Sequence, residues 1–291
     1  MTIGRLFKRS INSTLTKSRI AVYLWLFNLL FSLLIVAPFY FMIRNETSSS
    51  LMGDQLIRGF DFLLLGDILT KYTDMGALLS GSILIPVLLF ITLSIFVNGG
   101  IIGRLFDETE KPSVKDFISD SARYFFRFFR VFLISCVVYG LIFGLLYRLV
   151  GELLKTWTKN AGSEWPLIWS SNIKFLILLL LFSIVRMFFD YVRVRLVIED
   201  SRKTIRATLL TFSFVFTRFF KAWGLYIMAG VVTLVFGAIY LVGAKIIPNS
   251  GILFALLLIW QQLYVISKMW TKILFFSGEL HLFKQVEESA V

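Results

Sequence analysis

The residues of this sequence best suited to chemistry are charged side chains inside long apolar stretches. Arg186, Asp190 and Arg193 follow one another at spacings of four and three residues, so a helix would place them on one face. Ionisable groups within a membrane span cost free energy and often mark ion or proton pathways. A proton or ion relay is one interpretation. The other is a structural ion pair near the end of a span, where arginine side chains can extend to the lipid headgroups.

A second polar group lies in the last apolar stretch. Gln261 lies deepest, and Lys268 and Lys272 follow it on the same helix face. If this face lined a cavity, it would suit anionic headgroups or solutes. Otherwise the glutamine hydrogen-bonds to a neighbouring helix and the lysines anchor a cytoplasmic span end. Both interpretations remain open.

Signals for an enzyme are weak in this sequence, and an intramembrane enzyme that uses adjacent acids such as Glu199 and Asp200 ranks third among the possible functions. The single histidine, His281, rules out a multi-histidine metal site, and its place near the chain end does not suit a Ser-His triad. The single cysteine, Cys136, excludes an intramolecular disulfide. Neither a GxxxxGK[ST] nor a GxGxxG phosphate loop occurs. We therefore expect no catalytic residues, no metal and no cofactor.

Composition indicates the kind of protein that holds these residues. Hydrophobic residues make up 57% of the 291-residue chain, charged residues only 16%, and 31 residues are Phe. So much bulky apolar surface needs lipid to cover it. The net charge of +12 would suit nucleic acid in a soluble protein, but here it is better explained by basic residues at cytoplasmic span ends. The sequence predicts an all-α integral membrane protein that does not bind nucleic acid.

Six segments have the length and apolarity needed to cross a bilayer. They are residues 20–43, 81–103, 131–150, 173–192, 223–246 and 251–277. The basic arm 1–19 and the basic segment 193–221 should be cytoplasmic, and the slightly acidic loop 44–80 should be external. Within that loop, apolar spacing over 56–65 predicts a short helix on the membrane surface. The tail 278–291 returns to the cytoplasm, as both termini should.

A shift of 91 residues superimposes two parts of the sequence. "RFFRVF" at 127–132 then meets "RFFKAW" at 218–223, and Arg104 meets Arg195 without a gap. Self-similarity at a fixed shift indicates a repeat. We assign units of about 81–150 and 173–246, which run in the same direction across the membrane and are therefore parallel repeats.

Each unit predicts an amphipathic helix at the membrane surface that turns, at "RFF", into the next span. We call these two predicted turns the elbows; their arginines would lie at the headgroups while the phenylalanines enter the acyl region. In the first unit, the GxxxG pairs Gly99/Gly103 and Gly140/Gly144 predict close helix packing. The elbow residues are Arg104, Glu108, Arg127, Arg130, Arg195, Glu199, Arg218 and Lys221.

The stretches "NGGIIGRLFDETEKPSVKDF" and "RVRLVIEDSRKTIRATLLTFSFVFTRFFKAW" carry a family resemblance. Across about residues 80–245 the chain resembles bacterial multi-span families of unknown function and the membrane domain attached to some glycerophosphodiester phosphodiesterases. No phosphodiesterase catalytic domain is present. The resemblance implies a bacterial inner-membrane location and a fold, and carries no activity with it.

Taken together, these features predict a noncatalytic scaffold or accessory subunit. Its basic cytoplasmic face would engage anionic lipid or a partner protein, and a homo-oligomer is also open. The alternative is a transporter or lipid-handling protein with a pathway at the interface of the repeats, lined by Arg186, Asp190, Gln261 and Lys268.

Overall fold

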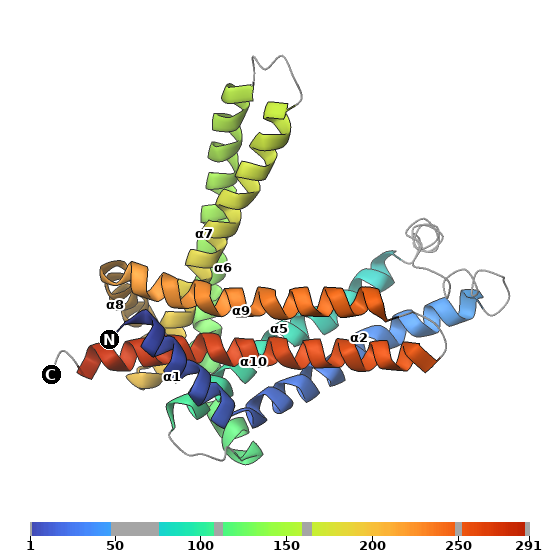
Figure 1. The fold of residues 1–291 in the computed structure, drawn as a ribbon, viewed down its shortest axis with the longest axis horizontal. Coiled ribbons are helices and arrows are strands. Elements are labelled where there is room, and N and C mark those ends of the chain that lie inside the picture. The colour runs from blue at the N-terminus through green and yellow to red at the C-terminus, as the bar shows by residue number, and fades with distance from the viewer. Residues whose placement is uncertain (1, 48–75, 108–112, 159–164, 248–251, 289–291) are drawn as a thin grey trace. The chain divides into compact units, whose positions relative to one another are not determined.

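A computed structural model describes residues 2–47, 76–107, 113–158, 165–247 and 252–288. Within these ranges all regular secondary structure is helical, as the composition predicted (Figure 1). The predicted surface helix at 56–65 lies outside the described residues. The helices are α1 (Ile3–Thr16), α2 (Arg19–Thr47), α5 (Gly76–Phe106), α6 (Val114–Thr158), α7 (Trp165–Ile198), α8 (Thr204–Thr217), α9 (Phe219–Ile246) and α10 (Ile252–Glu288).

Five of the described helices are long and apolar enough to cross a membrane. The crossing segments are Leu84–Phe106, Val114–Thr156, Ile168–Ile198, Phe219–Ile246 and Leu253–Glu288, and each overlaps a predicted span. A sixth crossing requires α1 and the first part of α2 to act as one span, bent by 67° at the break between them. These numbers are typical of a multi-pass membrane protein.

The chain divides into two compact units, 23–94 and the remainder. In the smaller unit, Phe27 and Phe31 of α2 both pack against Phe90 of α5, with ring centroids 6.3 and 5.9 Å apart. In the larger unit, α6 lies beside α7 and α9 beside α10 as antiparallel hairpins (Figure 1).

Buried side chains of the larger unit gather in one part of it, which we call the packed end. Tyr191 and Phe128 are fully buried there, with Leu6 from α1 and Leu282 from α10. Elsewhere the same helices present apolar side chains on their surface, as lipid-facing segments must. Leu141 of α6, for example, is 58% exposed. The packed end comprises residues 2–22, 95–107, 113–131, 185–229 and 271–288.

The described residues of the predicted arm 1–19 and tail 278–291 are largely helical and contribute to the packed end. α1 buries Leu6, Ser10 and Thr14 and packs against α9 and α10. α10 continues through the predicted tail to Glu288, because Leu280, Leu282 and Phe283 keep an apolar face toward the core. Both segments are therefore structural parts of the packed end.

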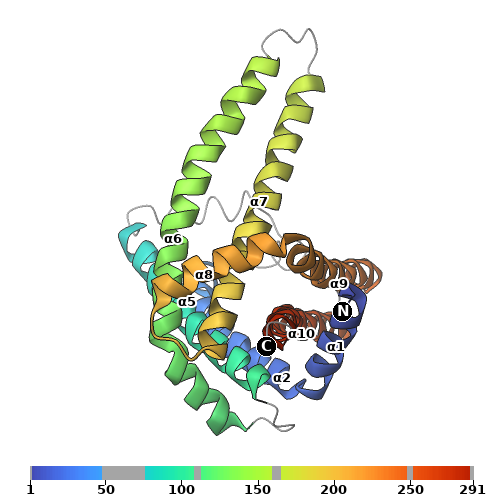
Figure 2. The same cartoon turned by 90° about the vertical axis from the view of Figure 1, so that its left-hand side faces the viewer.

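The two predicted elbows differ. α6 is helical without a break from Val114 to Thr158. The predicted surface helix and the predicted span of the first repeat are therefore one helix, which changes direction along its length (Figure 2). In the second predicted repeat the helix is broken at Arg218, which follows α8 and precedes α9. The helix ends before these stretches do correspond: α5 and α7 end 92 residues apart, at Phe106 and Ile198, and α6 and α8 begin 90 residues apart.

The two GxxxG pairs also differ. A Cβ added to Gly100 would lie 2.4 Å from Ser121 Oγ, and one on Gly103 would lie 2.8 Å from Asp120 Cβ, so this part of α5 packs closely on α6. Gly99 is in similar contact. No described atom lies within 4 Å of a Cβ added to Gly140 or Gly144. The predicted close packing is present for the first pair, whereas the second pair packs against nothing in the described part of the chain.

Candidate functional site

The packed end is held together by ion pairs between segments far apart in the sequence. Asp200, just after α7, accepts hydrogen bonds from Arg127 Nη1 at 2.6 Å and Arg123 Nη2 at 2.8 Å, both on α6. The side chain of Arg127 is only 11% exposed. The hydrogen bond from Arg127 is the main reason that the pKa of Asp200 lies below its ordinary value, and the bond from Arg123 adds to the effect. This cluster joins the end of α7 to the first third of α6.

The backbone also helps to position Asp200. Its φ of 43° lies in the left-handed region, which aspartate tolerates better than most residues other than glycine. The chain reverses there between α7 and α8, so the carboxylate projects toward α6.

A second set of contacts fixes the end of α5. Arg104 Nε donates to Asp120 Oδ2 of α6 at 2.6 Å, and its Nη1 lies 3.1 Å from Asp107. Lys17, 6% exposed, donates through Nζ to the carbonyl oxygens of Arg104 and Leu105, at 2.7 and 3.3 Å. A cation at a helix C-terminus satisfies carbonyls that have no partner within the helix and opposes the negative end of the dipole.

These contacts surround a charged cavity of about 490 Å³. Among its lining residues are Arg104, Asp107, Asp120, Arg123, Asp200 and Lys284. The arginines and aspartates pair with one another, and Lys284 Nζ lies 4.9 Å from the ring centroid of Phe106. Because positive and negative side chains balance, the cavity has no marked preference for either sign of ligand.

The first sequence-predicted polar group is partly brought together. Asp190, 6% exposed, forms an ion pair with Arg193 one turn later. Lys272 of α10 lies within electrostatic reach of both. Arg186 differs from them because its side chain is exposed. The structural ion pair is therefore observed, with Arg186 outside it.

Sequence reasoning missed Glu279 of α10, which joins this group. It is 3% exposed, its two carboxylate oxygens have no hydrogen-bond partner among the described residues, and charges on Arg186, Asp190 and Arg193 act on it. The signal available in the sequence was an acidic residue inside the apolar stretch "ILFFSGELHLF". The prediction that 278–291 is a cytoplasmic tail outside the last span gave no reason to expect a buried acid there.

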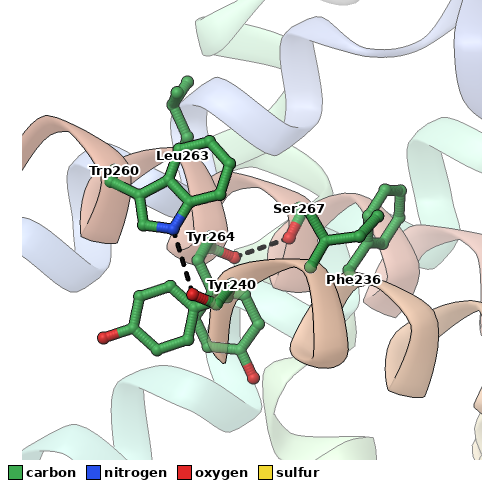
Figure 3. A pocket seen from close by; sticks show the side chains of 7 residues that line it. Phe236, Tyr240, Trp260, Leu263, Tyr264 and Ser267 are labelled. Carbon is green, nitrogen blue, oxygen red and sulfur yellow. Dashed lines mark hydrogen bonds between the residues drawn. The ribbon is translucent and has the colours of Figure 1, made fainter. Parts of the chain in front are cut away.

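Gln261 and Lys268 are not part of that group. Lys268 Nζ lies 5.7 Å from the ring centroid of Tyr264, and Gln261 is half-buried. Beside them, α9 and α10 enclose an aromatic pocket of about 180 Å³ (Figure 3). Its lining is Phe236, Ile239, Tyr240, Trp260, Leu263, Tyr264 and Ser267.

Figure 3 shows the side chains that line this pocket. Trp260 Nε1 donates to the carbonyl oxygen of Tyr240 at 3.1 Å, and the rings of Tyr240 and Tyr264 stack with centroids 4.4 Å apart. Its lining carries no charge, so the pocket suits an apolar chain or serves hairpin packing.

The remaining elbow residues are distributed over the packed end. Arg195 Nε donates to Glu199 Oε1 at 2.6 Å, and Arg130 Nη1 donates to the carbonyl oxygen of Arg202 at 3.4 Å. Arg218 is half-buried, with its guanidinium carbon 5.4 Å from the ring centroid of Phe214, and Lys221 is exposed. Glu108 lies outside the described residues.

Exposed basic side chains remain once these pairs are formed. Arg104, Arg127, Arg193 and Arg195, with side chains 11 to 17% exposed, each pair with a carboxylate. In the described part of the chain, another set is exposed and has no ion pair: Arg5, Lys8, Arg9, Arg19, Lys115, Arg202, Lys203, Arg206 and Lys221. We call this set the basic face.

No metal-binding group of three or more His, Cys, Asp or Glu residues occurs in the residues the structure describes. A comparison of the chain with protein-family models, curated proteins and solved structures finds no match. The family resemblance stays a hypothesis, and functional inference rests on the geometry above.

Proposed function

We propose that this protein is a noncatalytic integral membrane protein whose basic face binds anionic lipid headgroups, and that it acts as a scaffold or accessory subunit. In this proposal the protein resides in a bacterial inner membrane with both termini in the cytoplasm. The segments of about 81–150 and 173–246 are parallel repeats, and the packed end lies on the cytoplasmic side. A cytoplasmic leaflet rich in anionic lipid attracts basic residues at that level.

One observation carries the proposal. Four acidic residues of the packed end pair with arginines whose side chains are largely buried, while the basic face has no carboxylate partners among the described residues; the four are Asp120, Asp190, Glu199 and Asp200. Each Lys or Arg held near an anionic membrane surface contributes about 1 kcal/mol. Several such residues on α1 and around α8 would together give firm attraction.

Transport along the polar residues is less well supported. A pathway needs Asp190 or Gln261 to face a cavity, yet Asp190 is 6% exposed and paired with Arg193. Neither residue lines the charged cavity or the aromatic pocket.

The proposal can be tested by purification in mild detergent, with bound lipids and proteins measured by mass spectrometry. We compare the wild type with a variant carrying Arg202→Gln, Lys203→Gln and Arg206→Gln. A matched control removes three exposed charges outside the packed end, by Arg148→Gln, Lys155→Gln and Lys245→Gln.

We call the triple variant at residues 202, 203 and 206 the α8 variant. We expect it to retain several-fold less phosphatidylglycerol than the wild type or the control. Equal retention in all three would refute lipid binding by this face. A stoichiometric protein partner that is lost only from the α8 variant would assign the face to a protein instead of lipid.

A further inference from the structure

Arg186 is an exposed arginine within an apolar span. It lies on α7 inside the membrane-crossing segment Ile168–Ile198 and has no hydrogen bond or ion pair to any described residue. The nearest acid on its helix face, Asp190, already pairs with Arg193. An unpaired guanidinium at this depth costs free energy unless a partner from outside the chain satisfies it.

Three helices meet around Arg186. The Tyr139 ring of α6 packs against Phe182 and Phe189 of α7, with centroids 5.7 and 6.2 Å apart. From α9, Trp223 Nε1 donates to Ser183 Oγ at 3.5 Å. Arg186 lies within electrostatic reach of Asp190 and, more weakly, of Tyr226, Tyr139 and Glu279. Arg186 therefore lies where α6, α7 and α9 come together.

The two tyrosine hydroxyls are also available to a ligand. Tyr139 and Tyr226 are half-buried, and neither hydroxyl is hydrogen-bonded to a described residue. A guanidinium with two phenol donors beside it matches the several acceptor oxygens of a phosphate group.

The surrounding charge favours an anion over a cation. Arg186, Arg193 and Lys272 supply three positive charges, against the two carboxylates of Asp190 and Glu279. The apolar surface beside them selects a lipid over a soluble ion, because Phe182 is 46% and Val137 62% exposed, and acyl chains can cover them.

We propose that Arg186, assisted by the hydroxyl groups of Tyr139 and Tyr226, binds the phosphate of an anionic membrane lipid. Arg186 is not one of the residues of the basic face, so this site can exist whether or not that face binds lipid.

Native mass spectrometry of the 291-residue chain titrated with phosphatidylglycerol provides the test. Arg186→Gln should weaken the tightest lipid-binding step about tenfold, since it removes a charge-assisted hydrogen bond. The matched control Arg148→Gln removes the same charge from an exposed position on α6, outside both the packed end and the basic face, and should leave that step unchanged. The double variant Tyr139→Phe, Tyr226→Phe, which keeps all charges, should weaken it about fivefold.

Three results would overturn the proposal. Equal weakening by Arg186→Gln and Arg148→Gln would show only general electrostatic attraction between the protein and the lipid. Displacement of the lipid by millimolar inorganic phosphate would assign the site to a soluble anion. If Glu279→Gln lowers thermal stability as much as Arg186→Gln while neither changes lipid binding, Arg186 instead pairs internally with Glu279.

Discussion

The two "RFF" segments, alike in sequence and 91 residues apart, differ in structure. In the first, Arg127 lies inside one continuous helix, is buried, and pairs with Asp200. In the second, Arg218 stands at a break between α8 and α9 and contacts the Phe214 ring without an acidic partner in the described chain. The same short sequence therefore carries a buried ion pair in one place and a junction between two helices in the other.

The difference comes from what each segment meets. Arg127 meets Asp200, 73 residues further along the chain, whereas Arg218 contacts the ring of Phe214 and no carboxylate among the described residues. Phe128 is fully buried, whereas its counterpart Phe219 is half-buried and Phe220 is 83% exposed. The role of each arginine depends more on the residues it meets from distant parts of the sequence than on the "RFF" sequence itself.

The largest effect should come from reversing the charge of the two arginines. Arg127→Glu would place a buried carboxylate opposite Asp200 and should destabilise the protein by about 3 kcal/mol or more. Arg218→Glu, with no buried partner to oppose, should cost less than about 1 kcal/mol. Thermal unfolding in detergent measures both. Similar losses for the two variants would mean that the arginines have the same role.

The glycine pairs provide the next contrast. Gly100→Leu should destabilise the packing of α5 on α6 by about 1–3 kcal/mol, because even a Cβ there would collide with Ser121 and the Phe117 backbone. Gly144→Leu has open space around it and should be neutral or slightly stabilising, since leucine favours helix over glycine. Chemical denaturation of both variants gives the comparison. A strong loss from Gly144→Leu alone would reveal packing against something outside this chain.

Removing the carboxylate should have a smaller effect. Asp200→Asn keeps a residue that tolerates the left-handed backbone but loses the charge that pairs with Arg127 and Arg123. We expect a loss of about 1 kcal/mol, reduced by solvent screening because Asp200 is half-exposed. The parallel variant Glu199→Gln, which affects only a pair within one turn of α7, should cost less. Equal losses would weaken the role given to Asp200.

The smallest effect is a pH dependence of the same pair. The pKa of Asp200 is lowered in the folded protein, so its stabilising contribution is complete at neutral pH. As the pH falls below the ordinary carboxyl range and through the lowered pKa, that contribution disappears. Unfolding temperatures measured from pH 7 to 3 should fall less steeply for Asp200→Asn than for the wild type. Identical slopes would contradict the ion pair.

Local sequence patterns predicted the helical class and the position of the long apolar helices, because apolar runs of sufficient length have few other solutions. They also predicted the ion pair of Asp190 on α7, since its partner lies one turn away. They could not predict the ion pair between Arg127 and Asp200, because the residues around Arg127 do not specify a partner 73 residues away in the sequence. Nor could they distinguish the continuous α6 from the broken α8 and α9, since neither "RFFRVF" nor "RFFKAW" contains Gly or Pro.

The central claim, that the basic face binds anionic lipid, is tested most directly by lipid selectivity in a bilayer. The protein is reconstituted with spin-labelled phosphatidylglycerol or phosphatidylcholine, and the immobilised fraction of each lipid is measured at low and at 1 M salt. We predict that phosphatidylglycerol is preferred at low salt and that the preference declines at 1 M salt, where charges are screened within about 3 Å. Equal immobilisation of the two lipids at low salt would contradict the claim.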